Sequence, residues 1–106
     1  MLEVKNKIIS IIDLLENKPG FFFASNNYSY NELKSFLLGY LTCLDESYNF
    51  SINIYFSEWL NKKYKKTSLF WSEYINEILA ENNDKQAIEI LFREFRHCID
   101  SLDSGI

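Results

Sequence analysis

Three glutamates recur at four-residue spacing in the second half of the chain. Glu73, Glu77 and Glu81 have no lysine or arginine between them. Residues four apart are neighbours on a helix, so each like-charged pair costs about 0.2–0.5 kcal/mol. A helix that carries such a row either neutralises it with another part of the chain or presents it to a basic partner. The chemistry that this spacing predicts is therefore electrostatic recognition of a positively charged surface.

The other reactive side chains form no catalytic or metal-binding pattern. His97 is the only histidine, and we expect it on the outer, solvated face of the last helix, without the pocket that a general base needs. Cys43 and Cys98 lack an electropositive setting that would lower a thiol pKa, and we expect both to be small core residues. The three glycines are too dispersed for a phosphate-binding loop. We therefore predict a protein without enzymatic activity, metal or other cofactor.

A cluster of lysines, Lys62, Lys63, Lys65 and Lys66, lies between two expected helices. One interpretation is a small RNA-binding patch in which Tyr64 is the sole aromatic side chain. The other, which we favour, is a solvated loop that balances the acids nearby. The net charge of −4 argues against nucleic acid as the main partner, because phosphate binding needs a basic footprint.

Charge is segregated along the chain. The first 70 residues carry eight basic and seven acidic side chains, whereas the rest carries three basic and eight acidic ones. On the last expected helix, Glu89 is spaced to pair with Arg93, and Arg96 with Asp100. The row of glutamates on the preceding helix has no such partners. This acidic excess suits binding to a basic protein surface, and a merely solvated acidic face is the simpler alternative.

The spacing of apolar residues predicts helices along nearly the whole chain. The first is expected over about Leu2–Glu16 and is stopped by Pro19-Gly20. Ser29 and Glu32 form a capping box that begins the second. The later helices are expected to begin at Ser51, at Thr67 or Ser68, and after Asn82-Asn83-Asp84. Segment 21–28 has no helical period, so we expect an extended arm or one short strand whose phenylalanines belong to the core.

These elements predict an all-α, single-domain bundle of about five helices over residues 1–106, with one short extended segment near residues 21–28. The hydrophobic fraction of 47% and the aromatic fraction of 17% are typical of a globular domain. Gly39 interrupts a good helix, and we expect a neighbouring element to approach it closely. The sequence begins without the apolar stretch of a secretion signal and has no run of about 20 apolar residues, which predicts a cytosolic protein without a membrane span.

The order of aromatic and small residues resembles a known group of proteins. Its elements are Lys18-Pro19-Gly20-Phe21, Leu33-x-x-Phe36-x-x-Gly39-Tyr40, Phe56-x-x-Trp59-Leu60, Trp71-x-x-Tyr74-Ile75 and Ala87-Ile88-x-x-Leu91-Phe92-x-x-Phe95. Over about Pro19–Phe95 the chain is similar to small bacterial immunity proteins of polymorphic toxin and contact-dependent growth inhibition systems. The family's usual Met-Tyr after the Pro-Gly is replaced here by Phe21-Phe22.

The resemblance implies a cytosolic antitoxin that binds the C-terminal toxin domain delivered by a neighbouring cell and that blocks the active site or another essential surface. Many such toxins are nucleases, whose clefts must be positive to hold phosphates. The candidate toxin-binding residues are Glu73, Glu77, Glu81, Asp84, Glu89 and Glu94. The alternatives are a noncatalytic adaptor or regulatory subunit that uses the same acidic face, and an RNA-binding module that uses Lys62–Lys66. The oligomeric state stays open.

Overall fold

The computed structural model describes residues 2–102, which form helices joined by short connections and contain no β-strand. The elements are α1 (Leu2–Asn17), α2 (Gly20–Phe23), α3 (Tyr30–Tyr48), α4 (Ile52–Lys63), α5 (Trp71–Glu73), η1 (Tyr74–Leu79) and α6 (Asp84–Ser101). α5 continues directly into η1, a π-helix with i→i+5 hydrogen bonds. The predicted all-α class is confirmed.

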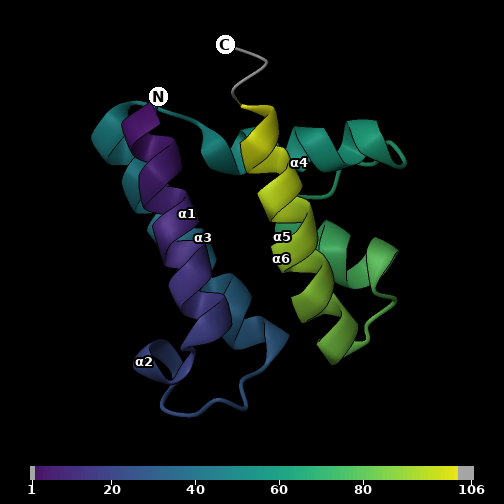
Figure 1. The fold of residues 1–106 in the computed structure, drawn as a ribbon. Coiled ribbons are helices and arrows are strands. Elements are labelled where there is room, and N and C mark those ends of the chain that lie inside the picture. Colours follow the sequence, from purple (N-terminus) through teal and green to yellow (C-terminus); the bar gives the residue numbers. More distant parts are fainter. Residues whose placement is uncertain (1, 103–106) are drawn as a thin grey trace.

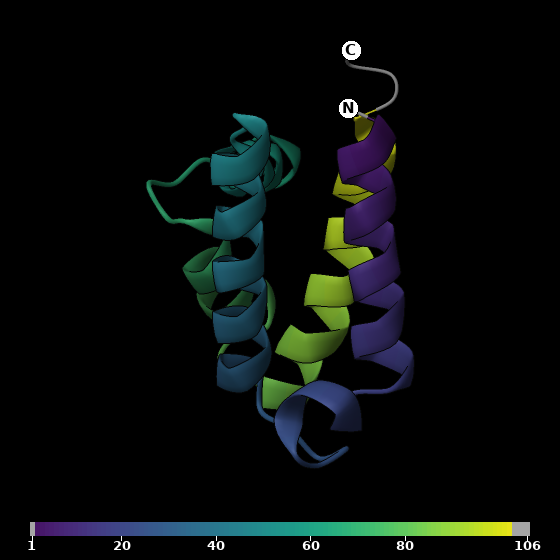
Figure 2. The same ribbon diagram turned by 90° about the vertical axis from the view of Figure 1, so that its left-hand side faces the viewer.

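α6 is the helix around which the others are arranged. It packs against α1, α3, α4 and η1, and in Figure 2 α3 and α1 stand to the left and right of it. α4 crosses the bundle at the end where α6 finishes (Figure 1), where the hydroxyls of Tyr55 and Ser101 lie 2.9 Å apart. This central position explains why the inward face of α6 is wide and apolar.

The core beside α6 is aromatic. Phe56 of α4 packs against Trp71 and Phe95 with ring centroids 5.5 and 4.8 Å apart, and all three side chains are fully buried. The indole Nε1 of Trp71 donates to Asn53 Oδ1 at 2.9 Å, so the one polar group of this ring is satisfied. α4, α5 and α6 therefore share one well-packed core, which fixes the start of η1.

The segment expected to be extended contains a helical turn. α2 covers Gly20–Phe23, and the carbonyl of Pro19 accepts hydrogen bonds from the amides of Phe22 and Phe23. Proline suits the start of a helix because its missing amide is not needed there. Phe21 is 73% exposed, whereas Phe22 and Phe23 are half-buried. The expectation that this phenylalanine run belongs to the core is therefore wrong for Phe21.

Helix starts were predicted correctly where the cap is local. Ser29 and Glu32 form the expected capping box at the start of α3, and Asn83 Oδ1 accepts from the amide of Gln86 at the start of α6. Both caps bond backbone amides within three residues, so the sequence is sufficient to find them.

Two other helix starts are capped from a distance. Ser51 precedes α4 but makes no side-chain cap; instead Asp45 of α3 accepts from the amide of Ile52 at 2.7 Å. The helix expected to begin at Thr67 or Ser68 begins later, where the amide of Trp71 donates to Ser57 Oγ at 2.8 Å. In both places a preceding helix supplies the acceptor that sequence spacing could not reveal.

Gly39 and Cys43 also differ from expectation. A side chain at Gly39 would meet no atom within 4 Å, so no neighbouring element approaches this exposed glycine. Cys43, expected in the core, is exposed, whereas Cys98 is buried as expected. Both exposed residues lie on the outer side of α3, away from the buried stripe that ends with Leu41 and Leu44.

Candidate protein-interaction surface

The candidate acids gather where α5, η1 and the start of α6 meet the start of α3. We define the acidic surface as Glu73, Glu77, Glu81 and Asp84. Glu73 is half-buried, and the other three side chains are exposed. Their placement depends on Tyr30 at the start of α3 and on the turn between η1 and α6.

Tyr30 connects the two ends of the acidic surface. Its backbone amide donates to both carboxylate oxygens of Asp84, at 3.1 and 3.2 Å, and its hydroxyl donates to the carbonyl of Ser72 at 2.7 Å. Burial and then the nearby carboxylate of Glu73 raise the pKa of the Tyr30 hydroxyl, which therefore stays protonated and keeps donating. A single buried residue thus ties the start of α6, which carries Asp84, to α5, which carries Glu73.

Glu73 and Glu77 lie on two consecutive elements of different helix type. Glu73 closes α5 and accepts a hydrogen bond from the hydroxyl of Ser72, and Glu77 lies in η1. The i→i+5 bonding of a π-helix widens each turn, so residues four to five apart are axial neighbours. The like-charge repulsion between these two acids stays a prediction.

Glu81 lies in a turn and not on the predicted helix. η1 ends at Leu79, and Glu81 and Asn82 adopt left-handed backbone angles with φ of 50° and 64°. The amide of Asn82 donates to the carbonyl of Asn76 at 2.8 Å, and the two asparagine side chains also bond. The turn is therefore folded back against η1, which keeps Glu81 close to the end of the glutamate row.

The acidic surface is not neutralised by the chain's own cations. Among residues 2–102, none of the ion pairs in the structure includes Glu73, Glu77 or Glu81. The carboxylate of Asp84 bonds a backbone amide and no basic side chain. The two arginines of α6 are directed elsewhere, so negative charge remains available at this end of the molecule.

Both arginines of α6 differ from the expected i,i+4 pairing. Arg96 reaches across to α1 and pairs with Asp13 at 2.9 Å and Glu16 at 2.6 Å, not with Asp100. Arg93 bonds Glu94 at 3.1 Å, which leaves Glu89 without the expected partner. Glu89 is exposed on α6, but no contact in the described part of the chain joins it to the acidic surface.

Glu94 is buried, so the prediction that it belongs to an outward acidic face is wrong. Its side chain is 2% exposed and accepts from Lys63 Nζ at 2.9 Å, Tyr64 Oη at 2.7 Å and Arg93 Nε at 3.1 Å. Burial raises the pKa of this carboxyl, but the three donors outweigh it, and the net pKa lies below its usual range. Glu94 is therefore a structural carboxylate that joins α4 to α6.

A signal for this burial was present in the sequence. Ile90, Glu94 and Cys98 follow one another at four-residue spacing, so they lie on the same inward face of α6, and all three are buried. The four-residue periodicity indicated the position of Glu94. The cation and the hydroxyl that satisfy it, Lys63 and Tyr64, come from a distant part of the sequence.

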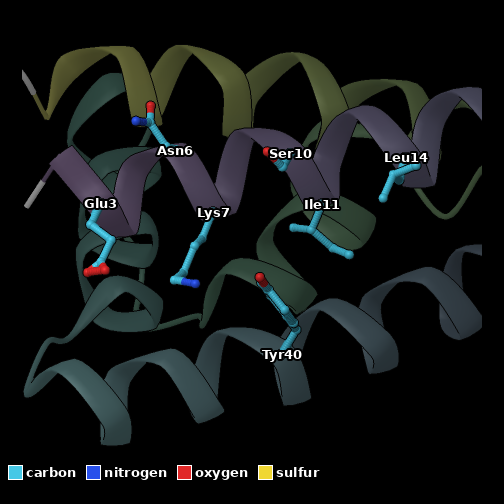
Figure 3. Close-up of a pocket in the computed structure, with 7 residues that line it drawn as sticks. All are labelled: Glu3, Asn6, Lys7, Ser10, Ile11, Leu14 and Tyr40. Carbon is cyan, nitrogen blue, oxygen red and sulfur yellow. The ribbon is translucent and has the colours of Figure 1, made fainter.

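A shallow groove between α1 and α3 offers no catalytic arrangement (Figure 3). Its lining is Glu3, Asn6, Lys7, Ser10, Ile11, Leu14 and Tyr40. Lys7 and Ile11 extend from α1 toward α3, and Tyr40 extends from α3 toward them. Burial is the main cause of a raised pKa at Tyr40, so its hydroxyl is neutral and unsuited to nucleophilic chemistry.

The other reactive groups show no chemistry in the described residues. His97 is exposed, and burial raises the pKa of the Cys98 thiol to about 12, so this thiol is not ionised at neutral pH. Residues 2–102 contain no group of three or more histidine, cysteine, aspartate or glutamate side chains placed to hold a metal. None of the helices they form has the length and apolar character needed to span a membrane.

Comparison with known proteins adds no relative: no family model, curated protein or solved structure matches this chain.

Proposed function

We propose that this protein is a noncatalytic immunity protein that binds a toxin domain of the nuclease class and covers its basic cleft with the acidic surface. The carboxylates of Glu73, Glu77 and Glu81, which take part in none of the ion pairs formed within residues 2–102, carry this proposal. The resemblance of the aromatic and glycine pattern to bacterial immunity proteins supports it. The proposed site of action is the cytoplasm, where such an inhibitor would meet an incoming toxin.

The physical basis is charge complementarity on a preformed surface. A nuclease must present positive charge to hold phosphates. A carboxylate that is exposed and unpaired keeps its field directed outward, which speeds encounter with such a cleft and excludes the negatively charged substrate. Because the acids lie on elements tied together through Tyr30 and the turn at Asn82, little ordering is needed on binding.

The structure changes which candidate residues the proposal uses. Glu73, Glu77 and Glu81 are the proposed contacts with the toxin, and Asp84 both contributes charge and holds the start of α3. Glu89 is retained as a peripheral contact because it is exposed and unpaired with Arg93. Glu94 is removed from the contacts, since it is buried under three donors of its own chain.

Titration calorimetry of the protein against the toxin encoded beside it tests the proposal. We expect Glu77→Lys combined with Glu81→Lys to weaken binding by at least about tenfold, with the largest loss of affinity at low salt. The control is Glu3→Lys combined with Glu46→Lys, which makes the same change of net charge at two exposed acids outside the acidic surface. Unchanged affinity in the double variant, or an equal loss in the control, would remove the acidic surface from the interface.

A further inference from the structure

A second surface differs in character from the acidic surface, because basic and apolar side chains line it. It runs between α4 and the segment 64–70 and has a volume of about 890 Å³, a size typical of ligand-binding clefts. Its main lining residues are Ile54, Lys62, Tyr64, Lys66, Leu69 and Phe70. We call it the lysine groove. None of the acids of the acidic surface lines it.

Segment 64–70 forms the outer wall of the lysine groove and is held in place by hydrogen bonds to Asn61 and Tyr74. The side chain of Asn61 accepts from the amide and hydroxyl of Thr67 at 2.6 and 2.7 Å, and donates to the carbonyl of Leu69 at 3.2 Å. The hydroxyl of Tyr74 accepts from the amide of Lys65 at 2.8 Å and donates to its carbonyl at 2.5 Å. Two anchor points, the half-buried Asn61 and the buried Tyr74, therefore hold segment 64–70 in one shape, which lowers the entropic cost of binding.

Two lysines of the lysine groove are not neutralised by acidic side chains within residues 2–102. Lys63 pairs with Glu94, but Lys62 and Lys66 are exposed and take part in none of the ion pairs formed within residues 2–102. Glu58 is the single acidic residue of the lining. We expected the lysines of this loop to balance nearby acids, and within residues 2–102 Lys63 does so by pairing with Glu94. Lys62 and Lys66 remain as two cations at the groove.

Apolar side chains lie beside these cations. Ile54 is 55% exposed and Phe70 is 38% exposed, although both are large hydrophobic residues. Leu69 is half-buried next to them and packs on the core. Exposed apolar area gathered in a concave site, with cations at its edge, is typical of a surface that receives a partner carrying both an apolar side chain and negative charge.

We infer that the lysine groove binds an extended acidic peptide segment of a partner protein, with its carboxylates on Lys62 and Lys66 and one apolar side chain against Ile54 and Phe70. Two of the apolar lining residues, Ile54 and Leu69, are aliphatic and offer no ring face, so the groove suits an apolar peptide side chain better than a series of stacked bases. The Tyr64 hydroxyl is bonded to Glu94, and Lys63 Nζ lies over the Tyr64 ring, 5.2 Å from its centroid, so one face of this ring is already occupied. This inference is independent of the proposed function, because the two surfaces share no residue.

Selection from a displayed library of random peptides tests the inference. We expect the wild-type protein to enrich sequences that combine several Asp or Glu with an aromatic or aliphatic residue. A synthetic peptide from the enriched set should shift amide resonances of α4 and segment 64–70 in an NMR titration. Its affinity should fall about tenfold or more in Lys62→Glu combined with Lys66→Glu, and should also fall in Ile54→Ser.

The matched control is Lys18→Glu combined with Lys85→Glu, which makes the same change of net charge at two exposed lysines outside the groove. Retained binding by this control, together with loss in the groove variant, supports the inference. Four results would overturn it: no enriched peptide, enrichment of basic or uncharged peptides, equal loss in both double variants, or groove resonances that respond to oligouridine and not to the acidic peptide. Circular dichroism melting of each variant confirms that it is folded.

Discussion

Glu94 and Glu77 are the same residue type on neighbouring elements, and the molecule uses them in opposite ways. Glu94 is buried beneath Lys63, Tyr64 and Arg93 and joins two helices. Glu77 is exposed, and no ion pair within residues 2–102 includes it. The difference teaches that acidic composition alone does not define a binding surface. Carboxylates that the fold keeps out of the core and out of its own ion pairs are the ones available to a partner.

The largest expected difference between the two regions is in stability. Glu94→Ala removes three hydrogen bonds and should lower the free energy of unfolding by about 2–3 kcal/mol. The loss stays below that of a fully buried ion pair because the Lys63 and Arg93 side chains are 37% and 56% exposed and can be rehydrated. Urea unfolding measures it. Glu89→Ala is the control on the same helix, and an equal small effect of both would erase the distinction.

The same carboxylate should make stability depend on pH. Because the folded-state pKa of Glu94 lies below its ordinary value of 4.5, its contribution is present above that pH and is lost as the pH falls through the lowered pKa. We expect the difference in melting temperature between the wild type and Glu94→Gln to be largest near neutral pH and to shrink in acid. A difference that stays constant throughout acid titration would show that charge is not the cause.

Asp84 lies between the two extremes, since it is exposed and yet holds the amide of Tyr30. Asp84→Ala should destabilise the protein by about 1 kcal/mol and speed hydrogen exchange of that amide. Gln86→Ala, a change at an exposed neighbour in the same helix turn, should stay within about 0.5 kcal/mol. Unaltered exchange at Tyr30 in the aspartate variant would mean that Asp84 belongs entirely to the acidic surface.

The smallest effect is expected at the glutamate row and has the opposite sign. Glu77→Gln relieves repulsion with Glu73 and should stabilise the protein by about 0.2–0.5 kcal/mol, an amount that salt reduces. Glu46→Gln on α3 has no acid three or four residues away and should change stability less. Destabilisation by Glu77→Gln would indicate an internal partner for this carboxylate and would weaken the contrast with Glu94.

Features that depend on short sequence separations were predictable. The capping box of Ser29 and Glu32 and the cap at Asn83 act over three residues, and the helices follow from the apolar period. The helical turn of α2 was missed because it has no apolar period of its own. The π-helical η1 was missed because its i→i+5 bonds leave no signature in residue spacing that separates them from an α-helix.

The candidate site was only partly predictable for the same reason. The uncompensated row of glutamates was visible in the sequence, because the absence of nearby cations is a local property. Whether a distant cation would reach them was not visible. Arg96 could have turned to Asp100 on its own helix, and it instead pairs with Asp13 and Glu16 of α1. A long basic side chain can pair with several acids, and folding determines which of them lie within its reach.

The sequence by itself determined that this protein is a helical domain with an acidic second half, because periodicity, caps and charge are written in neighbouring residues. Tertiary structure decided which carboxylates face a partner: it buried Glu94 under Lys63 and Tyr64, tied Asp84 to Tyr30, and left Glu77 and Glu81 outside. The physical reason is that burial and the donors supplied by other elements decide whether a carboxylate is paired within the protein or exposed to a partner. Both are set when the helices pack.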